Sequence, residues 1–588
     1  MLLLPATGWS APKYDQSPFG MNGLNLVHAR EDPNVFANGA RTVKVMKDAG
    51  MYWARLELWW GVVEPEKGKF DWTFADKEAK LYRDQGMNGL CLLCYSSEWS
   101  RKPPADDAER ALYANYVYQM VSRYKDTFHV WEIWNEPNIP SFWPEPNVKD
   151  YTLMLKEAYK AAKKADPNCT ILAASTSGPD LDYIKGIYAN GGWDYCDGIS
   201  IHPYSMCGGP IAQRLDKTLR MHQEYLRSKS KVQSSKFKTG KPGTLNLKPG
   251  TLNPKSLWIT EMGWTSKNAQ EDRDQAVYVV QSYVISLANG VEKLFWFCLD
   301  DWGEKWGVVR NSNPLDPKPS YSAYQNLTRA LGSPGKPAEF EGYLKLPIGT
   351  ACYVFKRPDG RRVLILWSND KLTRTVSFPH RTSMWRMKDI LGEPVDMKGD
   401  GVRVGPMPVI ITGVGQGQVG PVGRQYNPYQ EHKGQNLALN GSMESLNSER
   451  GADWWNPGRF EGSAKDGTMA TVDGGRRGKC ISISKSGERA AYDQGPIPVD
   501  VGKTYRLTGW IKTQDATGNN QIAFFWYSGN MWTYQSEART KNVTGTNDWT
   551  KVSVTAKVPE GATLVRINLI SEKNSGTAMF DDIALVEE

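Results

Sequence analysis

The sequence lacks the features of a membrane-embedded or nucleic-acid-binding protein. No apolar run reaches the roughly 18 residues that a membrane-spanning helix needs. The 72 lysines and arginines barely exceed the 64 acidic residues, so the net charge of +8 is small for 588 residues. Part of the excess lies in the lysine-rich segment between Lys229 and Lys255, but it does not reach the clustered basic pattern of a nucleic-acid binder. We therefore expect no membrane span and no nucleic-acid partner. The length predicts about two to four domains.

Cysteine gives little sign of metal or redox chemistry. Cys91 and Cys94 form a CxxC pair, but the surrounding apolar segment Gly89–Tyr95 is typical of a buried strand. We therefore expect buried free thiols. The first residues, Met1-Leu-Leu-Leu-Pro5, are too short for the apolar part of a signal peptide, so no export signal is visible.

Aromatic residues are abundant, with 23 tryptophans, 27 tyrosines and an aromatic share of 11%. Such an excess indicates either large aromatic cores or surfaces that stack on flat ligands such as sugar rings. Composition alone does not separate these two readings.

The segment 15–334 alternates short strand-like apolar runs with longer helical stretches. Eight such βα units predict a (β/α)8 TIM barrel, an α/β fold with a parallel sheet. The expected strands are Gly20–Leu26, Tyr52–Leu58, Gly89–Cys94, His129–Trp134, Thr170–Ala174, Asp197–His202, Leu257–Glu261 and Lys293–Cys298.

The rest of the chain has the short strands and turns of all-β domains. We predict a small β-sandwich at 335–414, a Gly/Pro/Gln-rich linker at 415–435 and a C-terminal β jelly roll at 436–588. Before the seventh barrel strand, Lys241-Pro-Gly-Thr-Leu-Asn246 recurs as Lys248-Pro-Gly-Thr-Leu-Asn253, which indicates an inserted solvated loop, with a sugar or anion contact as the alternative.

Two motifs place carboxylates at strand ends. Val130-Trp-Glu-Ile-Trp-Asn-Glu-Pro-Asn138 runs along the fourth strand into the following loop, and Leu257-Trp-Ile-Thr-Glu-Met-Gly-Trp264 ends the seventh. Glu136 and Glu261 therefore fall on the rim where barrel active sites are built. A protonated carboxyl group beside an ionised one suits glycoside hydrolysis. Glu132 shares a strand face with Glu136 but lies one layer deeper, so we expect it to be buried and hydrogen-bonded.

The Trp134-Asn-Glu-Pro137 and Thr260-Glu-Met-Gly-Trp264 motifs resemble the clan A retaining glycoside hydrolases, closest to the family thirty-nine barrels. The resemblance implies that Glu136 is the acid/base and that Glu261 is the nucleophile. It also implies that the two carboxyl groups lie about 5–5.5 Å apart.

The same resemblance assigns several substrate-binding positions. Asn135 would bind the sugar 2-hydroxyl, Tyr204 would orient Glu261, His202 would lie near the acid/base, Arg55 would keep the nucleophile ionised, and Trp296 would lie beneath the −1 sugar. Apart from the resemblance, a core histidine, a structural ion pair with Glu57 and plain packing remain the alternatives for His202, Arg55 and Trp296. We also expect sugar contacts from rim residues, namely His28, Trp99, Trp264 and Trp302.

The C-terminal segment resembles the carbohydrate-binding modules of families four and nine. Asn436-Leu-Ala-Leu-Asn-Gly-Ser-Met-Glu444 and Phe580-Asp-Asp-Ile-Ala584 carry this resemblance. It implies that Glu444 and Asp581 hold a structural Ca²⁺, with a solvated strand end as the alternative. Tyr527, Tyr534 and four tryptophans could form a sugar platform: Trp454, Trp455, Trp526 and Trp532.

The sequence thus predicts a retaining, endo-acting β-glycoside hydrolase that cleaves a polysaccharide by double displacement. We expect an extracellular or periplasmic location and no cofactor for catalysis. The alternatives are an exo-acting β-glycosidase such as a β-xylosidase, and a non-catalytic carbohydrate-binding protein. The intact pair of carboxylates argues against the last.

Overall fold

The computed structural model describes most of the chain: residues 15–100, 103–204, 212–239, 255–301, 303, 305–346, 349–369, 373–395, 397–399, 401–429, 436–438, 440–444, 446–447, 451–452, 455–459, 467–529 and 533–588. The Lys-Pro-Gly-Thr-Leu-Asn repeat and Trp302 lie outside the described residues. The chain divides into two compact units, Met1–Pro179 with Tyr183–Tyr429, and Asp180–Asp182 with Gln430–Glu588.

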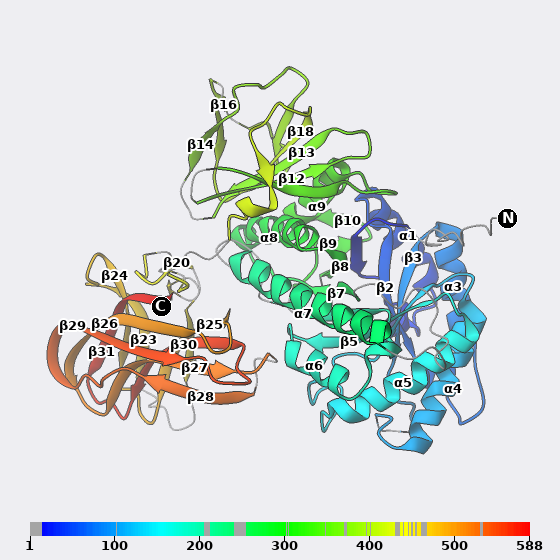
Figure 1. Ribbon diagram of the computed structural model, residues 1–588, viewed down its shortest axis with the longest axis horizontal. Coiled ribbons are helices and arrows are strands. Elements are labelled where there is room, and N and C mark those ends of the chain that lie inside the picture. Colours follow the sequence, from blue (N-terminus) through cyan, green and yellow to red (C-terminus); the bar gives the residue numbers. More distant parts are fainter. Residues whose placement is uncertain are drawn as a thin grey trace. The chain divides into compact units, whose positions relative to one another are not determined.

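The first unit contains a closed barrel of eight parallel strands, which confirms the predicted fold class. All eight expected strands are present, and Figure 1 shows helices around them. The strands are β1 (Phe19–Asn22), β2 (Trp53–Trp59), β3 (Asn88–Cys94), β4 (Val130–Ile133), β5 (Thr170–Ser177), β6 (Gly198–His202), β7 (Ser256–Met262) and β8 (Val291–Phe297).

Helices connect these strands, and side chains cap several of them. Asn147 and Asn268 accept hydrogen bonds from the first backbone N–H groups of α5 and α8, which are otherwise unpaired. The helices are α1 (Val35–Asp48), α2 (Trp60–Val63), α3 (Thr73–Gln85), α4 (Asp107–Tyr124), α5 (Val148–Ala165), α6 (Leu181–Ala189), α7 (Ala212–Thr239), α8 (Ala269–Ala288) and α9 (Pro319–Leu331). The hairpin β9 (Val309–Ser312) and β10 (Leu315–Pro317) precedes α9.

The inside of the barrel changes from apolar to polar along the strands. Near the strand starts lies a buried apolar cluster of Trp53, Leu90, Val130, Leu172, Trp258 and Phe295. Two residues further along β2 and β4, the buried Arg55 and Glu132 take the place of apolar side chains. The polar layer therefore begins inside the barrel and leads to its C-terminal rim, where barrel enzymes carry their active sites.

A small β-sandwich follows α9 in the same unit. A six-stranded sheet, in the order β15-β18-β13-β12-β11-β19, faces the three-stranded sheet β14-β17-β16 around one apolar core. The strands are β11 (Glu339–Leu344), β12 (Thr350–Lys356), β13 (Arg362–Ser368), β14 (Arg374–Ser377), β15 (Arg386–Asp389), β16 (Met397–Lys398), β17 (Gly401–Val404), β18 (Val409–Val414) and β19 (Val422–Gly423).

The predicted linker at 415–435 is wrong for residues 415–429. β19 pairs with β11, and the Tyr429 hydroxyl lies buried, where it accepts a hydrogen bond from Trp367 Nε1 at 3.0 Å. Glycine and glutamine made this segment look unstructured, but its few apolar residues complete the sandwich. Residues 430–435 lie outside the described part of the chain.

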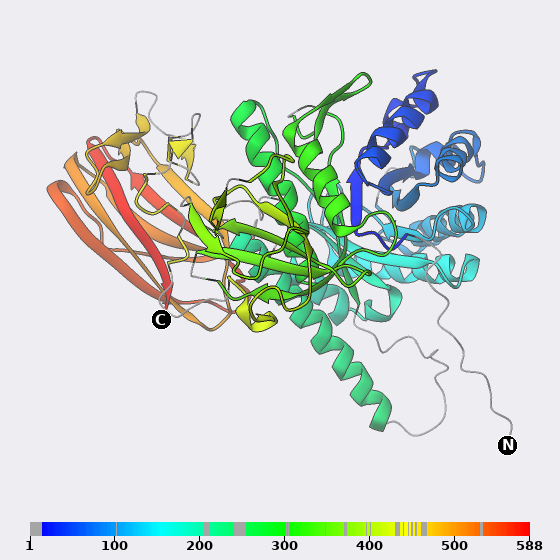
Figure 2. The same cartoon turned by 90° about the horizontal axis from the view of Figure 1, so that it is seen from above.

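The second unit is a β-sandwich of two antiparallel five-stranded sheets, β22-β25-β30-β27-β28 and β23-β24-β31-β26-β29. Its orange and red strands run side by side as curved layers in Figure 2. The sandwich strands are β22 (Asn456–Arg459), β23 (Thr468–Asp473), β24 (Lys479–Ser484), β25 (Ala490–Pro498), β26 (Thr504–Ala516), β27 (Asn519–Tyr527), β28 (Tyr534–Arg539), β29 (Gly545–Lys557), β30 (Leu564–Glu572) and β31 (Thr577–Glu587).

No helix in the described residues is long and apolar enough to cross a membrane. The seven described cysteines are buried and carry free thiols. Burial raises the pKa of the Cys91 and Cys94 thiols well above their usual range, which leaves them protonated and unreactive.

Candidate active site

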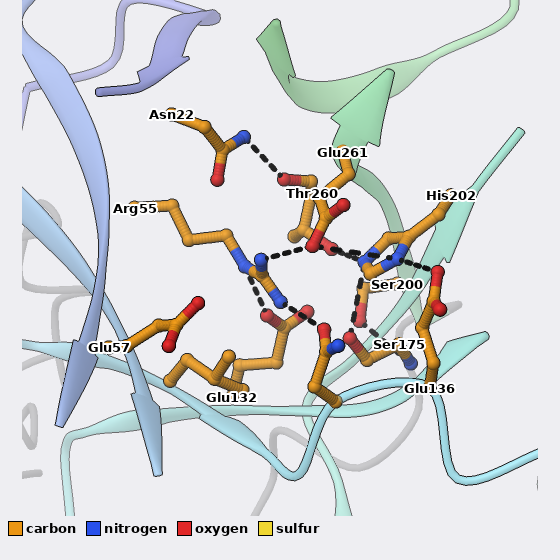
Figure 3. Close-up of polar contacts among 12 residues, drawn as sticks. Asn22, Arg55, Glu57, Glu132, Glu136, Ser175, Ser200, His202, Thr260 and Glu261 are labelled. Atoms are coloured by element: carbon orange, nitrogen blue, oxygen red, sulfur yellow. Dashed lines mark hydrogen bonds and ion pairs between the residues drawn. The ribbon is translucent and has the colours of Figure 1, made fainter. Parts of the chain in front are cut away.

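The centre of the candidate site is the buried guanidinium of Arg55 on β2. Its Nε donates to Glu132 Oε2 at 2.7 Å, Nη1 donates to Glu261 Oε1 at 2.5 Å, and Nη2 donates to Asn135 Oδ1 at 2.9 Å. Figure 3 shows the guanidinium between Glu132 and Glu261. These hydrogen bonds tie the ends of β4 and β7 to one cation on β2.

Glu261, on β7, is held as an ionised carboxylate. Its Oε1 accepts from Arg55, and its Oε2 accepts from the Tyr204 hydroxyl at 2.6 Å. Burial raises the pKa of this carboxyl group, but His202, Arg55 and Tyr204 outweigh burial and lower the pKa below its ordinary value. Glu261 is therefore charged at neutral pH, as a nucleophile must be.

Glu136 follows β4 and meets His202, the last residue of β6. Glu136 Oε1 lies 2.8 Å from His202 Nδ1, and the other ring nitrogen lies 3.0 Å from Thr260 Oγ1 and 3.2 Å from Ser175 Oγ. Burial lowers the pKa of His202, but the carboxylates of Glu261 and Glu136 raise it above its ordinary value. A fixed imidazole thus orients the Glu136 carboxyl group.

The backbone near Glu136 is strained. Trp134 and Glu136 have φ angles of 67° and 42°, in the left-handed region that side-chain-bearing residues seldom adopt. Such conformations cost about 1–3 kcal/mol each and cluster at functional sites. The Glu136 N–H donates to Ser175 O at 2.9 Å, which helps to hold this turn.

The two candidate carboxylates are close together. One ligand oxygen of Glu136, one of Glu261 and a ring nitrogen of His202 all lie within 4.8 Å of one another. This spacing also fits a metal ion. However, both oxygens of Glu261 already accept hydrogen bonds, and the Arg55 cation adjoins them. The donor set therefore fits an ionised carboxylate better than a metal centre.

The prediction that Trp296 contacts the sugar is wrong. The Trp296 side chain is 0% exposed, and its neighbour Phe295 lies in the inner apolar cluster, so strand alternation directs Trp296 away from the interior. Phe297, partly exposed at the end of β8, instead lies against the Tyr204 ring, with centroids 6.3 Å apart. Phe297 therefore faces Tyr204 at the barrel mouth, and Trp296 does not.

The other predicted rim residues are partly accessible. His28 Nε2 lies 3.2 Å from Glu57 Oε2, and the His28 side chain is 53% exposed. Trp99 donates its Nε1 hydrogen to Glu64 O at 2.9 Å, and Trp264 packs on Tyr278 with centroids 4.7 Å apart. These contacts anchor one edge of each indole, and both remain partly exposed.

Several residues of the site were missing from the sequence prediction. Thr260 and Ser175 contact His202, and Glu57 lies on the same face of β2 as Arg55. For Glu57 a signal existed, since alternation places it two residues beyond Arg55. Thr260 and Ser175 carried none, because threonine and serine are common at strand ends.

In the C-terminal unit, Glu444 and Asp581 approach one turn. Glu444 Oε1 accepts from Lys479 N at 2.9 Å, and the buried Asp581 accepts from Arg476 N at 2.6 Å and Asp582 N at 2.7 Å. Both carboxylates thus serve as acceptors for backbone N–H groups. A calcium ion would have to share these oxygens with them.

The aromatic residues of this unit fall into two groups. Trp455 and Trp526 are buried in its core, which excludes them from a sugar platform. Tyr527 and Tyr534 are more exposed and contact each other at 6.1 Å between centroids. Trp454 and Trp532 lie outside the described residues.

Known proteins resemble the barrel. The sequence model for glycosyl hydrolase family 10 matches residues 23–174. A curated β-galactosidase, Bga from Halorubrum lacusprofundi, is 31% identical over 126 residues, covering 16% of this chain and 18% of that protein. This chain thus spans only about a fifth of the relative's length.

Among solved structures, a family 39 glycoside hydrolase from the gut symbiont Bacteroides cellulosilyticus WH2 has a TM-score of 0.54 at 22% identity. The match covers 67% of this chain and 80% of that one, and at this identity it shows a shared fold. The family match and the shared fold both fall on the barrel, the part of the chain that carries the paired carboxylates.

Proposed function

We propose that this protein is a retaining β-glycoside hydrolase, with Glu261 as the nucleophile and Glu136 as the acid/base. The observation that carries the proposal is the pair of carboxylates at the C-terminal rim, with oxygens within 4.8 Å. Retaining enzymes hold their two carboxyl groups about 5–5.5 Å apart, whereas inverting enzymes leave about 6.5–9.5 Å for a water molecule.

The contacts of each carboxylate suit its role. Arg55 and Tyr204 hold Glu261 ionised and aimed, so that it can attack the anomeric carbon. Glu136, when protonated, donates its proton to the leaving oxygen, and the ionised carboxylate then activates the water that releases the sugar from Glu261. Asn135, whose Oδ1 accepts from Arg55, would bind the sugar 2-hydroxyl through its amide N–H groups, and this contact supports the proposal.

We further propose a polysaccharide substrate and endo cleavage. Partly exposed aromatic residues at the rim, including Trp59, Trp99, Trp264 and Trp306, support several sugar-binding subsites. A polymer substrate would place the enzyme outside the cytoplasm, in the extracellular space or the periplasm. The alternative within the same chemistry is an exo-acting β-glycosidase, whose products differ.

A product profile tests the function. Wild type and Glu261→Gln are incubated with β-linked xylans, glucans, mannans and galactans, and the products are sized. Mixed oligosaccharides formed by wild type alone would support endo cleavage. Single sugars would favour the exo-acting alternative. If no polymer and no aryl β-glycoside is cleaved, the hydrolase proposal fails and a carbohydrate-binding protein remains.

For the C-terminal unit we propose a carbohydrate-binding module with a structural calcium ion. Two acidic side chains around one turn support the ion, since Ca²⁺ prefers oxygen ligands. The exposed Tyr534 and the partly exposed Tyr527 support sugar stacking. Isothermal titration of the protein with Ca²⁺, and separately with each polymer, tests the two parts of this proposal.

A further inference from the structure

A third carboxylate stands beside the proposed reaction pair. Glu57 lies two residues beyond Arg55 on the same face of β2, a rise of about 6.6 Å toward the rim. Figure 3 shows it on the side of Arg55 away from Glu136. Its side chain is 13% exposed, so it lies within the barrel mouth and remains in contact with solvent.

Within the described residues, hydrogen bonds reach only one oxygen of the Glu57 carboxylate. Oε2 accepts from Trp59 Nε1 at 2.6 Å and lies 3.2 Å from His28 Nε2. Among the described residues, no hydrogen bond reaches Oε1. Arg55 is already matched by Glu132, Glu261 and Asn135, so Glu57 is not needed as its partner. In the described part of the chain, Oε1 of Glu57 therefore has no hydrogen-bond donor at the barrel mouth.

Aromatic and cationic groups lie next to the two residues that contact Glu57 Oε2, His28 and Trp59. The edge of the His28 ring meets Trp59 with centroids 4.9 Å apart, and the Arg30 guanidinium lies 5.5 Å from the Trp59 ring centre. The hydrogen bond to Glu57 is the main cause that raises the pKa of His28, so the ring keeps both N–H donors to a higher pH. An acceptor, a donor and an indole thus converge at one place.

We propose that Glu57, His28 and Trp59 form a sugar subsite that selects a residue with two neighbouring unsubstituted hydroxyl groups. The inference rests on the proposed hydrolase function. Glu57 Oε1 accepts the hydroxyl protons, His28 donates to a sugar oxygen, and Trp59 contacts the apolar face of the ring. Because the carboxylate needs O–H donors, the subsite rejects sugars that are esterified or etherified at these positions.

The test pairs a variant with altered substrates. The parent compounds are 4-nitrophenyl β-glycosides of xylose, glucose, galactose and mannose, each compared with its monodeoxy analogues. In wild type we expect loss of one contacted hydroxyl to lower kcat/KM by about 10- to 100-fold, the range for a hydrogen bond to a charged group. In Glu57→Ala this discrimination should fall below about threefold, because the deoxy analogue loses nothing further.

Two further variants serve as a conservative replacement and as a control. Glu57→Gln keeps an acceptor for Trp59 Nε1 and should give an intermediate discrimination, even if Glu57→Ala folds poorly. Glu31→Ala removes a carboxylate from the same loop as His28, and its side chain is 93% exposed, so it should retain the wild-type discrimination.

The outcomes separate the two proposals. An active wild type whose Glu57 variants slow parent and deoxy substrates by the same factor would overturn the subsite and leave the hydrolase intact. A wild type inactive on every glycoside and polymer would overturn both. Discrimination that disappears in both Glu57 variants, but not in Glu31→Ala, would support the subsite.

Discussion

The barrel mouth and the C-terminal sandwich each hold a pair of acidic side chains, but they hold them differently. In the barrel, Glu261 accepts from the side chains of Arg55 and Tyr204, which come from two other strands. In the sandwich, Glu444 and Asp581 accept from backbone N–H groups near a single turn. Acidic residues alone therefore do not identify a reaction site.

The hydrogen-bond donors to each pair of carboxylates determine what that pair can do. Side-chain donors from separate strands hold a carboxylate at an open rim and tune its pKa, as Arg55 does for Glu261. Backbone donors instead fix the turn that supplies them. Burial raises the pKa of Asp581, and its two N–H donors only partly oppose this. The first arrangement suits chemistry, and the second suits structure.

Replacing Glu261 should give the largest effect. We expect Glu261→Gln to lower turnover by about 10⁴-fold or more, because no covalent intermediate can form. The melting temperature should change little, because the amide still meets Arg55 and Tyr204. In Glu261→Ala, added azide should restore turnover and give a glycosyl azide of inverted configuration. Near-native turnover in Glu261→Gln would disprove the assignment.

Replacing Glu136 should depend on the leaving group. We expect Glu136→Gln to slow unactivated glycosides by about 10²–10⁴-fold, the usual contribution of general acid catalysis. Aryl glycosides with good leaving groups need no protonation and should be slowed much less in glycosylation. Rates measured across a series of phenols of increasing pKa check this. Equal slowing of all substrates would exclude the acid role.

Much of this contrast could be read from the sequence. Strand periodicity and the Asn-Glu-Pro motif located Glu136, and the position of Glu261 at a strand end located its partner. The roles of these residues stay predictions, but the structure brings them together with Arg55, Asn135, His202 and Tyr204. The alternation of side chains along a strand identifies these inward-facing residues because they are polar and their neighbours are apolar.

Strand alternation does not predict which side chains face inward where consecutive residues are all apolar. Phe295, Trp296 and Phe297 are all aromatic, so the sequence could not tell which of them face inward. The register shift in β7 between Ile259 and Met262 adds a further irregularity to the strand beside them. Contacts between distant segments, such as those of Ser175 and Thr260 with His202, likewise leave no local signal.

Arg55 links the chemistry of the barrel to its stability. Arg55→Met removes the partner of the buried Glu132, and we expect a loss of about 3–5 kcal/mol in the free energy of unfolding. Arg55 also lowers the pKa of Glu261. Any residual activity should therefore lose its acid limb at a higher pH than wild type, because Glu261 becomes protonated more readily. Denaturant titration and kcat/KM against pH measure the two effects.

An unchanged acid limb in Arg55→Met would show that Tyr204 and His202 suffice to keep Glu261 ionised. The lowered pKa of Glu261 also makes its contribution to stability depend on pH. A carboxyl group whose pKa is lowered by folding contributes stability above its unfolded pKa, and that stability disappears as the pH falls through the folded pKa. Tyr204→Phe is the matched variant, since it removes one donor and no charge.

The smallest effect should come from Asp581. Asp581→Asn replaces a carboxylate that accepts two backbone N–H groups, and we expect a loss of about 1–3 kcal/mol in the stability of the C-terminal unit. Turnover of soluble aryl glycosides should stay at the wild-type rate, because the reaction pair lies in the barrel.

Differential scanning calorimetry with and without Ca²⁺ shows whether the Asp581 carboxylate binds calcium or only fixes the turn. If it binds calcium, the ion should raise the melting temperature of wild type and not of Asp581→Asn. If the carboxylate only fixes the turn, Ca²⁺ should leave the melting temperature of both proteins unchanged. The pair in the sandwich would then be purely structural, unlike the pair in the barrel.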